Sequence, residues 1–167
     1  VKAALTGHLV ISTLHTNDSI STIRRLIDMG IPPYLVAEGT SVITAQRLLR
    51  RICGACRTEQ KVDRSELLLA GVPPDSVDEY KLIFKGQGCD KCNHTGMKGR
   101  LAIHEVLEVT PLIREGIVKG IPMHELRGRA VAAGMSTLRL SALERMREGL
   151  VSLQEVLSGT MSDDRID

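Results

Sequence analysis

The stretch TGHLVISTLHTND, residues 6–18, contains an apolar run that ends in four polar residues, His15, Thr16, Asn17 and Asp18. Residues 8–14 are rich in Val, Ile and Leu, which is typical of a strand buried on both faces of a parallel sheet. In open α/β sheets, ligands bind just outside the carboxyl ends of such strands. The polar residues therefore either face a ligand or cap the next helix, and the two roles are compatible because Asx and Ser/Thr caps are common.

Composition limits the classes of protein to consider. The 167 residues suit one domain, or one domain with a small appendage, and 43% apolar with 25% charged residues is ordinary for a globular protein. The net charge of +2 and the 2% aromatic content argue against a nucleic-acid-binding surface built on charge or stacking. We find no apolar run of membrane-spanning length and no signal peptide, so we expect a cytoplasmic protein without membrane insertion. The opening VKAALTG resembles the end of a helix that feeds a strand, so we expect a fragment of a longer chain.

The first block, 1–51, alternates strand and helix patterns, which predicts an α/β fold. After the expected strand at 8–14, a helix is expected at 19–29, with Asp18 or Ser19 as N-cap and Gly30 just past its end. A second helix is expected to start at the proline pair 32–33. Periodicity leaves 43–53 open as strand or helix.

The remaining chain divides into two further blocks. Residues 52–100 are interrupted by Gly, Pro and Cys, with one short helix and one strand expected, and hold too little apolar sequence for a core of their own. Residues 101–167 begin with a strand-like LAIHEVLEV and continue as short amphipathic helices. The polar tail SDDRID is expected to be frayed.

All four cysteines lie in two C-x-x-C pairs, Cys53 with Cys56 and Cys89 with Cys92. Two such pairs predict a structural zinc ion held by four thiolates. Disulfides are the alternative, which a cytosolic location disfavours, and a redox dithiol explains one pair but not two. Nearby His94 could replace a cysteine, but four cysteines already complete the tetrahedron. Gly54 and Gly88 are expected to allow the tight turns of the two loops.

Five segments taken in order resemble the C-terminal part of the type II secretion and type IV pilus assembly ATPases: LTGHLVISTLHTNDS, RLIDMGIPPYLVA, AQRLLRRICGACR, GCDKCNHTGMKGRLAIHEVL and GMSTLRLSALERMREGLVSLQEVL. The resemblance covers nearly the whole chain. It implies the C-terminal part of a RecA-like P-loop ATPase core at 1–51, a tetracysteine zinc lobe at 52–100 and a C-terminal helical subdomain at 101–167. Retraction ATPases of this superfamily generally lack the four cysteines, which favours the secretion or pilus-extension branch.

The resemblance also implies a function. It indicates a cytoplasmic homo-hexamer that hydrolyses ATP to move an inner-membrane platform protein during pilus or pseudopilus assembly. His15 would contact the γ-phosphate, and His8, the other histidine of the family's histidine box, would contact nucleotide or serve packing. Further nucleotide-binding candidates are Thr16, Asn17, Arg25 and Arg47, with a solvated, salt-bridged surface as the alternative for the arginines.

The chain also departs from the family pattern. It contains no G-x-x-x-x-G-K-[ST] sequence, so we expect ATP and Mg²⁺ to be bound mainly by a preceding part and this chain alone to be inactive. Met97 and His104 stand where family members often carry aromatic residues. Two other functions remain open at this point, a zinc-stabilised protein-interaction module without nucleotide chemistry and a nucleic-acid-binding zinc protein.

Overall fold

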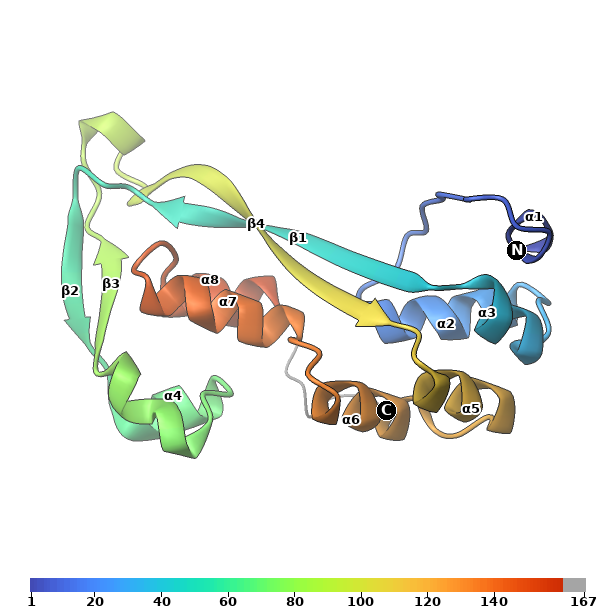
Figure 1. Cartoon of the computed structure of the whole chain (residues 1–167). Helices are drawn as coiled ribbons and strands as arrows, with labels where there is room; N and C mark the ends of the chain where they lie inside the picture. The colour runs from blue at the N-terminus through green and yellow to red at the C-terminus, as the bar shows by residue number, and fades with distance from the viewer. Residues whose placement is uncertain (161–167) are drawn as a thin grey trace. The chain divides into compact units, whose positions relative to one another are not determined.

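The computed structural model describes residues 1–160, so the tail SDDRID lies outside the described residues. The described chain forms two compact units (Figure 1). The first comprises 1–45 and 105–137, and the second comprises 46–104 and the described residues from 138 onward. The blocks 1–51, 52–100 and 101–167 follow composition and stay a prediction.

The first unit is built mainly from helices around one apolar core. Its helices are α1 (Lys2–Leu5), α2 (Ser19–Asp28), α3 (Pro33–Gly39), α5 (Pro111–Lys119) and α6 (Met123–Ala132). The core draws on α2, α3, α5, α6 and adjoining segments, and its members include Ile20, Ile23, Val36, Ile43, Leu107, Ile113, Ile117 and Leu126. Helices α2, α3, α5 and α6 therefore each bury one apolar stripe, whereas α1 has no buried residue.

Helix α2 forms where the sequence predicts it. The carboxylate of Asp18 accepts a hydrogen bond from the backbone N–H of Ser21, 2.7 Å away, and so caps the first turn. At the other end, Gly30 adopts φ +85°, and the Ile31 N–H donates to the Leu26 carbonyl. This is a Schellman ending, in which a left-handed residue is needed and glycine adopts it without steric cost.

The expected strand at 8–14 is wrong. These residues have no strand hydrogen bonding, and they run as an irregular segment between α1 and α2 (Figure 1). Leu9 and Ile11 are 91% and 87% exposed. A strand of a parallel sheet needs neighbouring strands to pair with, and none among residues 1–160 pairs with this segment. The apolar pattern is real, but the described chain supplies no surface that buries it.

Two long strands, β1 (Val42–Ile52) and β4 (Met97–Glu108), pair with each other and contribute residues to both units. The ambiguous segment 43–53 is therefore strand. The second unit adds β2 (Arg57–Lys61), β3 (Leu82–Gly86), the helices α4 (Arg64–Leu69), α7 (Leu138–Arg147) and α8 (Leu153–Gly159), and the 3-10 turns η1 (Pro74–Tyr80) and η2 (Asp90–Cys92). Strands β2 and β3 pair antiparallel, with Arg57 opposite Gly86 and Lys61 opposite Leu82.

Two arginines form hydrogen bonds that connect elements within the second unit. Glu155 of α8, almost buried, accepts hydrogen bonds from the backbone N–H and the Nε of Arg50 on β1, at 2.8 and 3.0 Å. Arg139 of α7 donates to the carbonyl oxygens of Ala70 and Thr160, at 3.2 and 2.9 Å. Arg50 is thus a structural residue here.

None of the helices in residues 1–160 has the length and apolar character needed to cross a membrane.

Candidate functional site

The four cysteines converge in the second unit. Their sulfur atoms all lie within 4.8 Å of one another. The Cys53–Cys89, Cys56–Cys92 and Cys89–Cys92 sulfur pairs are 4.0, 3.9 and 3.7 Å apart. Four sulfurs around a tetrahedral Zn²⁺, each about 2.3 Å from the metal, lie about 3.8 Å apart. The donor set and its spacing therefore fit a structural zinc ion.

The sulfurs of Cys92 and Cys56 have different electrostatic environments. Burial raises the pKa of Cys92, but the backbone N–H groups of Cys89 and Gly96 donate to its sulfur and bring the pKa down to about 6. Burial raises the pKa of Cys56 to about 11, against the opposing hydrogen bond from the Gly88 N–H. Four thiolates in one place repel one another, so a divalent cation is needed to hold all of them ionised.

The alternatives to a site of four cysteine ligands were disulfide bonds and a ligand role for His94. All four are free, which contradicts the disulfide reading, and the cluster found among residues 1–160 contains no histidine. His94 is exposed and its Nε2 lies 3.1 Å from Asp90 Oδ1, so it is a bystander as expected. Gly88 has φ +97° as the tight turn requires, whereas Gly54 has no left-handed conformation. Gly54 lies inside a tight turn that the Cys56 N–H closes on the Cys53 carbonyl, at 3.3 Å, and it does so with ordinary backbone angles.

A glycine pair beside the cluster gives a stability prediction. A Cβ on Gly86, the last residue of β3, would lie 1.9 Å from the Gly96 carbonyl oxygen, which accepts the Cys53 N–H at 2.9 Å. We expect Gly86→Ala to lower the free energy of unfolding of the zinc-loaded chain by about 1–3 kcal/mol, because the displaced backbone carries a ligand's hydrogen bond. Urea denaturation measures this. Gly54→Ala, whose Cβ meets nothing within 4 Å, is the matched control, and equal effects of both substitutions would contradict the prediction.

The candidate nucleotide-binding histidines lie in the first unit. His8 and His15 stand at opposite ends of the irregular segment, and both are exposed. The Nδ1 of His8 is 3.0 Å from Thr6 Oγ1. Thr16 is half-buried, and its hydroxyl lies 2.7 Å from the hydroxyl of Thr22 on α2. The nucleotide contacts of these residues stay predictions.

The remaining candidates lie on different elements. Asn17 is exposed and directly precedes the helix cap. Arg25 is exposed on α2 in the first unit, whereas Arg47 is half-buried on β1 in the second. Arg24, the residue before Arg25 on α2, pairs with Asp28 at 3.0 Å on the surface. The nucleotide-binding roles of Arg25 and Arg47 also stay predictions.

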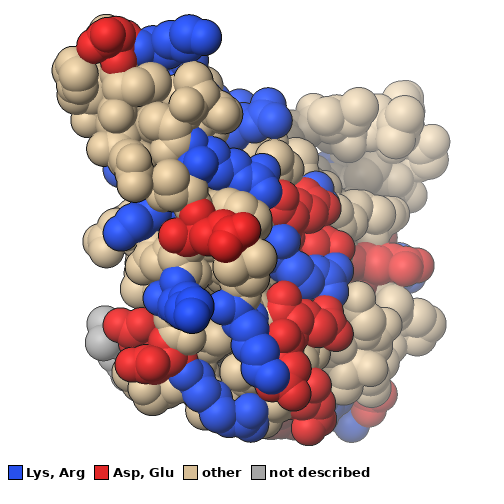
Figure 2. All heavy atoms as spheres, turned by 90° about the vertical axis from the view of Figure 1, so that its left-hand side faces the viewer, with Lys and Arg blue, Asp and Glu red and all other residues tan. Residues whose placement is uncertain are grey.

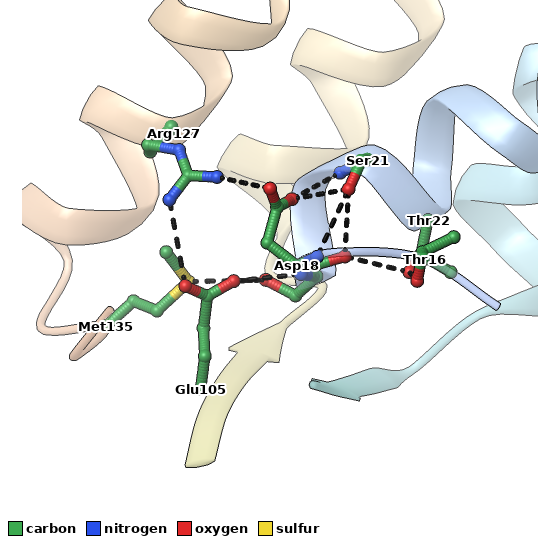
Figure 3. A network of polar contacts seen from close by, with 8 residues as sticks. Thr16, Asp18, Ser21, Thr22, Glu105, Arg127 and Met135 are labelled. Atoms are coloured by element: carbon green, nitrogen blue, oxygen red, sulfur yellow. Dashed lines mark hydrogen bonds and ion pairs between the residues drawn. The ribbon is translucent and has the colours of Figure 1, made fainter. Parts of the chain in front are cut away.

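Sequence reasoning missed a buried charge network at the start of α2 (Figure 3). Glu105 of β4 and Arg127 of α6 are 1% and 9% exposed. Arg127 Nη2 lies 3.1 Å from Asp18 Oδ2, and its Nη1 lies 3.7 Å from Glu105 Oε2. A signal existed, because Glu105 occupies an inward position of the alternating strand between Ile103 and Leu107, both of which are buried.

Charged side chains on one face of the molecule are interspersed. Figure 2 shows Lys and Arg lying next to Asp and Glu rather than forming one basic surface. In the second unit, Arg145 pairs with Glu148 at 2.7 Å, and Arg147 pairs with Glu79. Paired charges of this kind do not support a nucleic-acid surface, which requires clustered basic side chains.

The structure thus describes an α/β protein with a cysteine cluster suited to zinc and a histidine-bearing segment. The comparison with known families agrees with this description. The chain belongs to the type II/IV secretion system protein family, whose sequence model matches residues 1–158. The family expected from the sequence motifs is thereby confirmed.

Individual relatives give the same result. The chain is 46% identical, over 98% of its length, to the type IV pilus assembly ATPase PilB of Myxococcus xanthus, of which it covers 29%. It is 43% identical over 96% of its length to the PilB of Thermus thermophilus, covering 18% of that protein. It is 37% identical over 98% of its length to the type II secretion system protein E of Aeromonas hydrophila, covering 32%. The chain thus spans less than a third of the length of these relatives.

Proposed function

We propose that this chain is the C-terminal part of an ATPase that powers pilus or pseudopilus assembly. The observation that carries the proposal is the 46% identity over nearly the whole chain to a pilus assembly ATPase. The tetracysteine cluster supports the same branch of the family. Zinc would stabilise the fold without taking part in hydrolysis, since four thiolates leave no open coordination position.

Within this proposal, the exposed imidazole of His15 is the group that meets the terminal phosphate of ATP. A neutral imidazole donates to a phosphate oxygen or to a bound water, and that contact changes when the phosphate is released. Thr16, Asn17, Arg25 and Arg47 are the proposed neighbours of the nucleotide, and His8 contributes less. The assembly would be a cytoplasmic homo-hexamer that acts on an inner-membrane platform protein.

The first test compares two lengths of protein. The sequence 1–167 contains no G-x-x-x-x-G-K-[ST] loop, so we expect the isolated chain neither to bind Mg-ATP tightly nor to hydrolyse it. The complete protein encoded by the gene that contains this chain is expected to hydrolyse Mg-ATP. We expect a rate of up to about 100 per second, which is the upper end for many phosphoryl-transfer enzymes. Phosphate release measures the rate, and zinc-loaded preparations are used for both proteins.

A second candidate function is a zinc-stabilised interaction module. The exposed apolar segment 8–14 favours it, because such a segment is suited to burial against another protein surface. Absence of both nucleotide binding and hydrolysis in the complete protein would reject the ATPase proposal and support this second function.

A further inference from the structure

The buried charge network in the first unit calls for an explanation beyond stability. Glu105, Arg127 and Asp18 come from β4, α6 and the N-cap of α2, three segments distant in sequence. Removing charges from water is costly, and apolar side chains of similar volume often stabilise a core equally well. The residues that the network holds in place therefore indicate which role the buried charges serve.

Its contacts end on the first turn of α2 (Figure 3). Glu105 Oε1 accepts hydrogen bonds from the backbone N–H of Ser19, at 2.8 Å, and from the Ser19 hydroxyl. Arg127 binds one carboxylate oxygen of Asp18, while the other oxygen accepts the Ser21 N–H. The Thr22 hydroxyl donates to the Asp18 carbonyl and meets Thr16 Oγ1. The network thus holds the first turn of α2, and Thr16 contacts Thr22 on that same turn.

We infer that Arg127 and Glu105 are positioning residues that orient His15, Thr16 and Asn17 toward the phosphates of a bound nucleotide. This inference rests on the proposed function, because it requires that the histidine segment meets ATP. Neither residue would touch the nucleotide. Arg127 acts through the carboxylate of Asp18, and Glu105 acts through Ser19, so α6 and β4 together determine where the His15 imidazole lies.

Two mild substitutions test the inference in the complete protein. Asp18→Asn retains a side chain that caps helices well but removes the charge that faces Arg127. Arg127→Lys retains the charge but loses the planar fork that reaches both carboxylates. Because a displacement of about 1 Å can cost up to about 100-fold in rate, we expect kcat for ATP hydrolysis to fall about 10-fold or more in each variant. The KM for ATP is expected to stay within about 3-fold, since most nucleotide contacts are made elsewhere.

A matched control lies on the same helix. Arg129 of α6 pairs with Glu125 at 2.8 Å on the surface, away from the network contacts. Arg129→Met is expected to leave kcat unchanged. Equal losses in Arg129→Met and Arg127→Lys would overturn the inference, because the effect would then belong to α6 in general.

A double-substitution cycle with His15→Ala separates positioning from general stability. If Arg127 acts mainly through His15, then Arg127→Lys has a much smaller effect once the imidazole is removed, and what is left of the effect belongs to Thr16 and Asn17. The same fold loss in both backgrounds indicates a structural role and overturns the inference. If Arg127→Lys does not fold, Asp18→Asn decides by the same cycle.

The single variant His15→Ala distinguishes a failure of the proposed role of the histidine segment from a failure of the positioning inference. An unchanged rate in His15→Ala rejects the proposed role of the histidine segment, and the inference fails with it. A slow His15→Ala enzyme together with full activity in Asp18→Asn and Arg127→Lys overturns the inference alone.

Discussion

Replacing Cys92 by serine is expected to abolish stoichiometric zinc binding and to open residues 52–100 to protease. Cys92 is 6% exposed and its sulfur is the acceptor for two backbone N–H groups, from Cys89 and Gly96. A serine oxygen does not replace a thiolate as a zinc ligand, and structural zinc contributes about 10 kcal/mol or more to folding in small zinc domains. Metal analysis and limited proteolysis of the isolated chain measure both effects.

We expect a large loss of zinc and of protease resistance because the secondary structure around the cysteine cluster is small. Strands β2 and β3 have five residues each, and a two-stranded sheet is marginal without further support. Treatment with a strong chelator should reproduce the proteolysis pattern of Cys92→Ser. His94→Ala is the control, because its ring pairs with Asp90 and lies outside the sulfur cluster. Wild-type zinc content in Cys92→Ser would reject a four-thiolate site.

Much of the fold follows from local sequence signals. Asp18 and Gly30 mark the ends of α2 because a cap and a left-handed residue are requirements of the helix itself. The cysteine cluster was equally predictable, since the C-x-x-C spacing brings two sulfurs to each loop without help from the rest of the chain.

Non-local features were harder to predict. The strand expected at 8–14 depends on partner strands, which the described chain does not provide, so a correct apolar pattern gave a wrong element. The ion pair between Asp18 and Arg127 joins residues more than a hundred positions apart, and no local pattern connects them. Glu105 was detectable in principle as a charge at an inward strand position, but its partners were not.

Replacing His15 by alanine in the complete protein is expected to lower kcat for ATP hydrolysis by about 100-fold, the usual cost of removing one donor to a developing charge. The affinity for ATP should change little, because a phosphate-cradling loop elsewhere would supply most of the binding. The His15 side chain is exposed and belongs to no core cluster among residues 1–160, so the variant should keep its zinc and its fold. Single-turnover hydrolysis and an equilibrium nucleotide-binding measurement separate the two quantities.

His8→Ala is the informative comparison for this experiment. The His8 ring contacts Thr6 near α1, at the far end of the same segment, so it has no share in the capped end at Asp18. We expect a smaller loss of rate in His8→Ala than in His15→Ala. The reverse order would assign the phosphate contact to His8, and full activity in both variants would remove the segment from the hydrolytic mechanism. The order of the two effects therefore tests whether the end of the segment held by α2 is the end that meets the nucleotide.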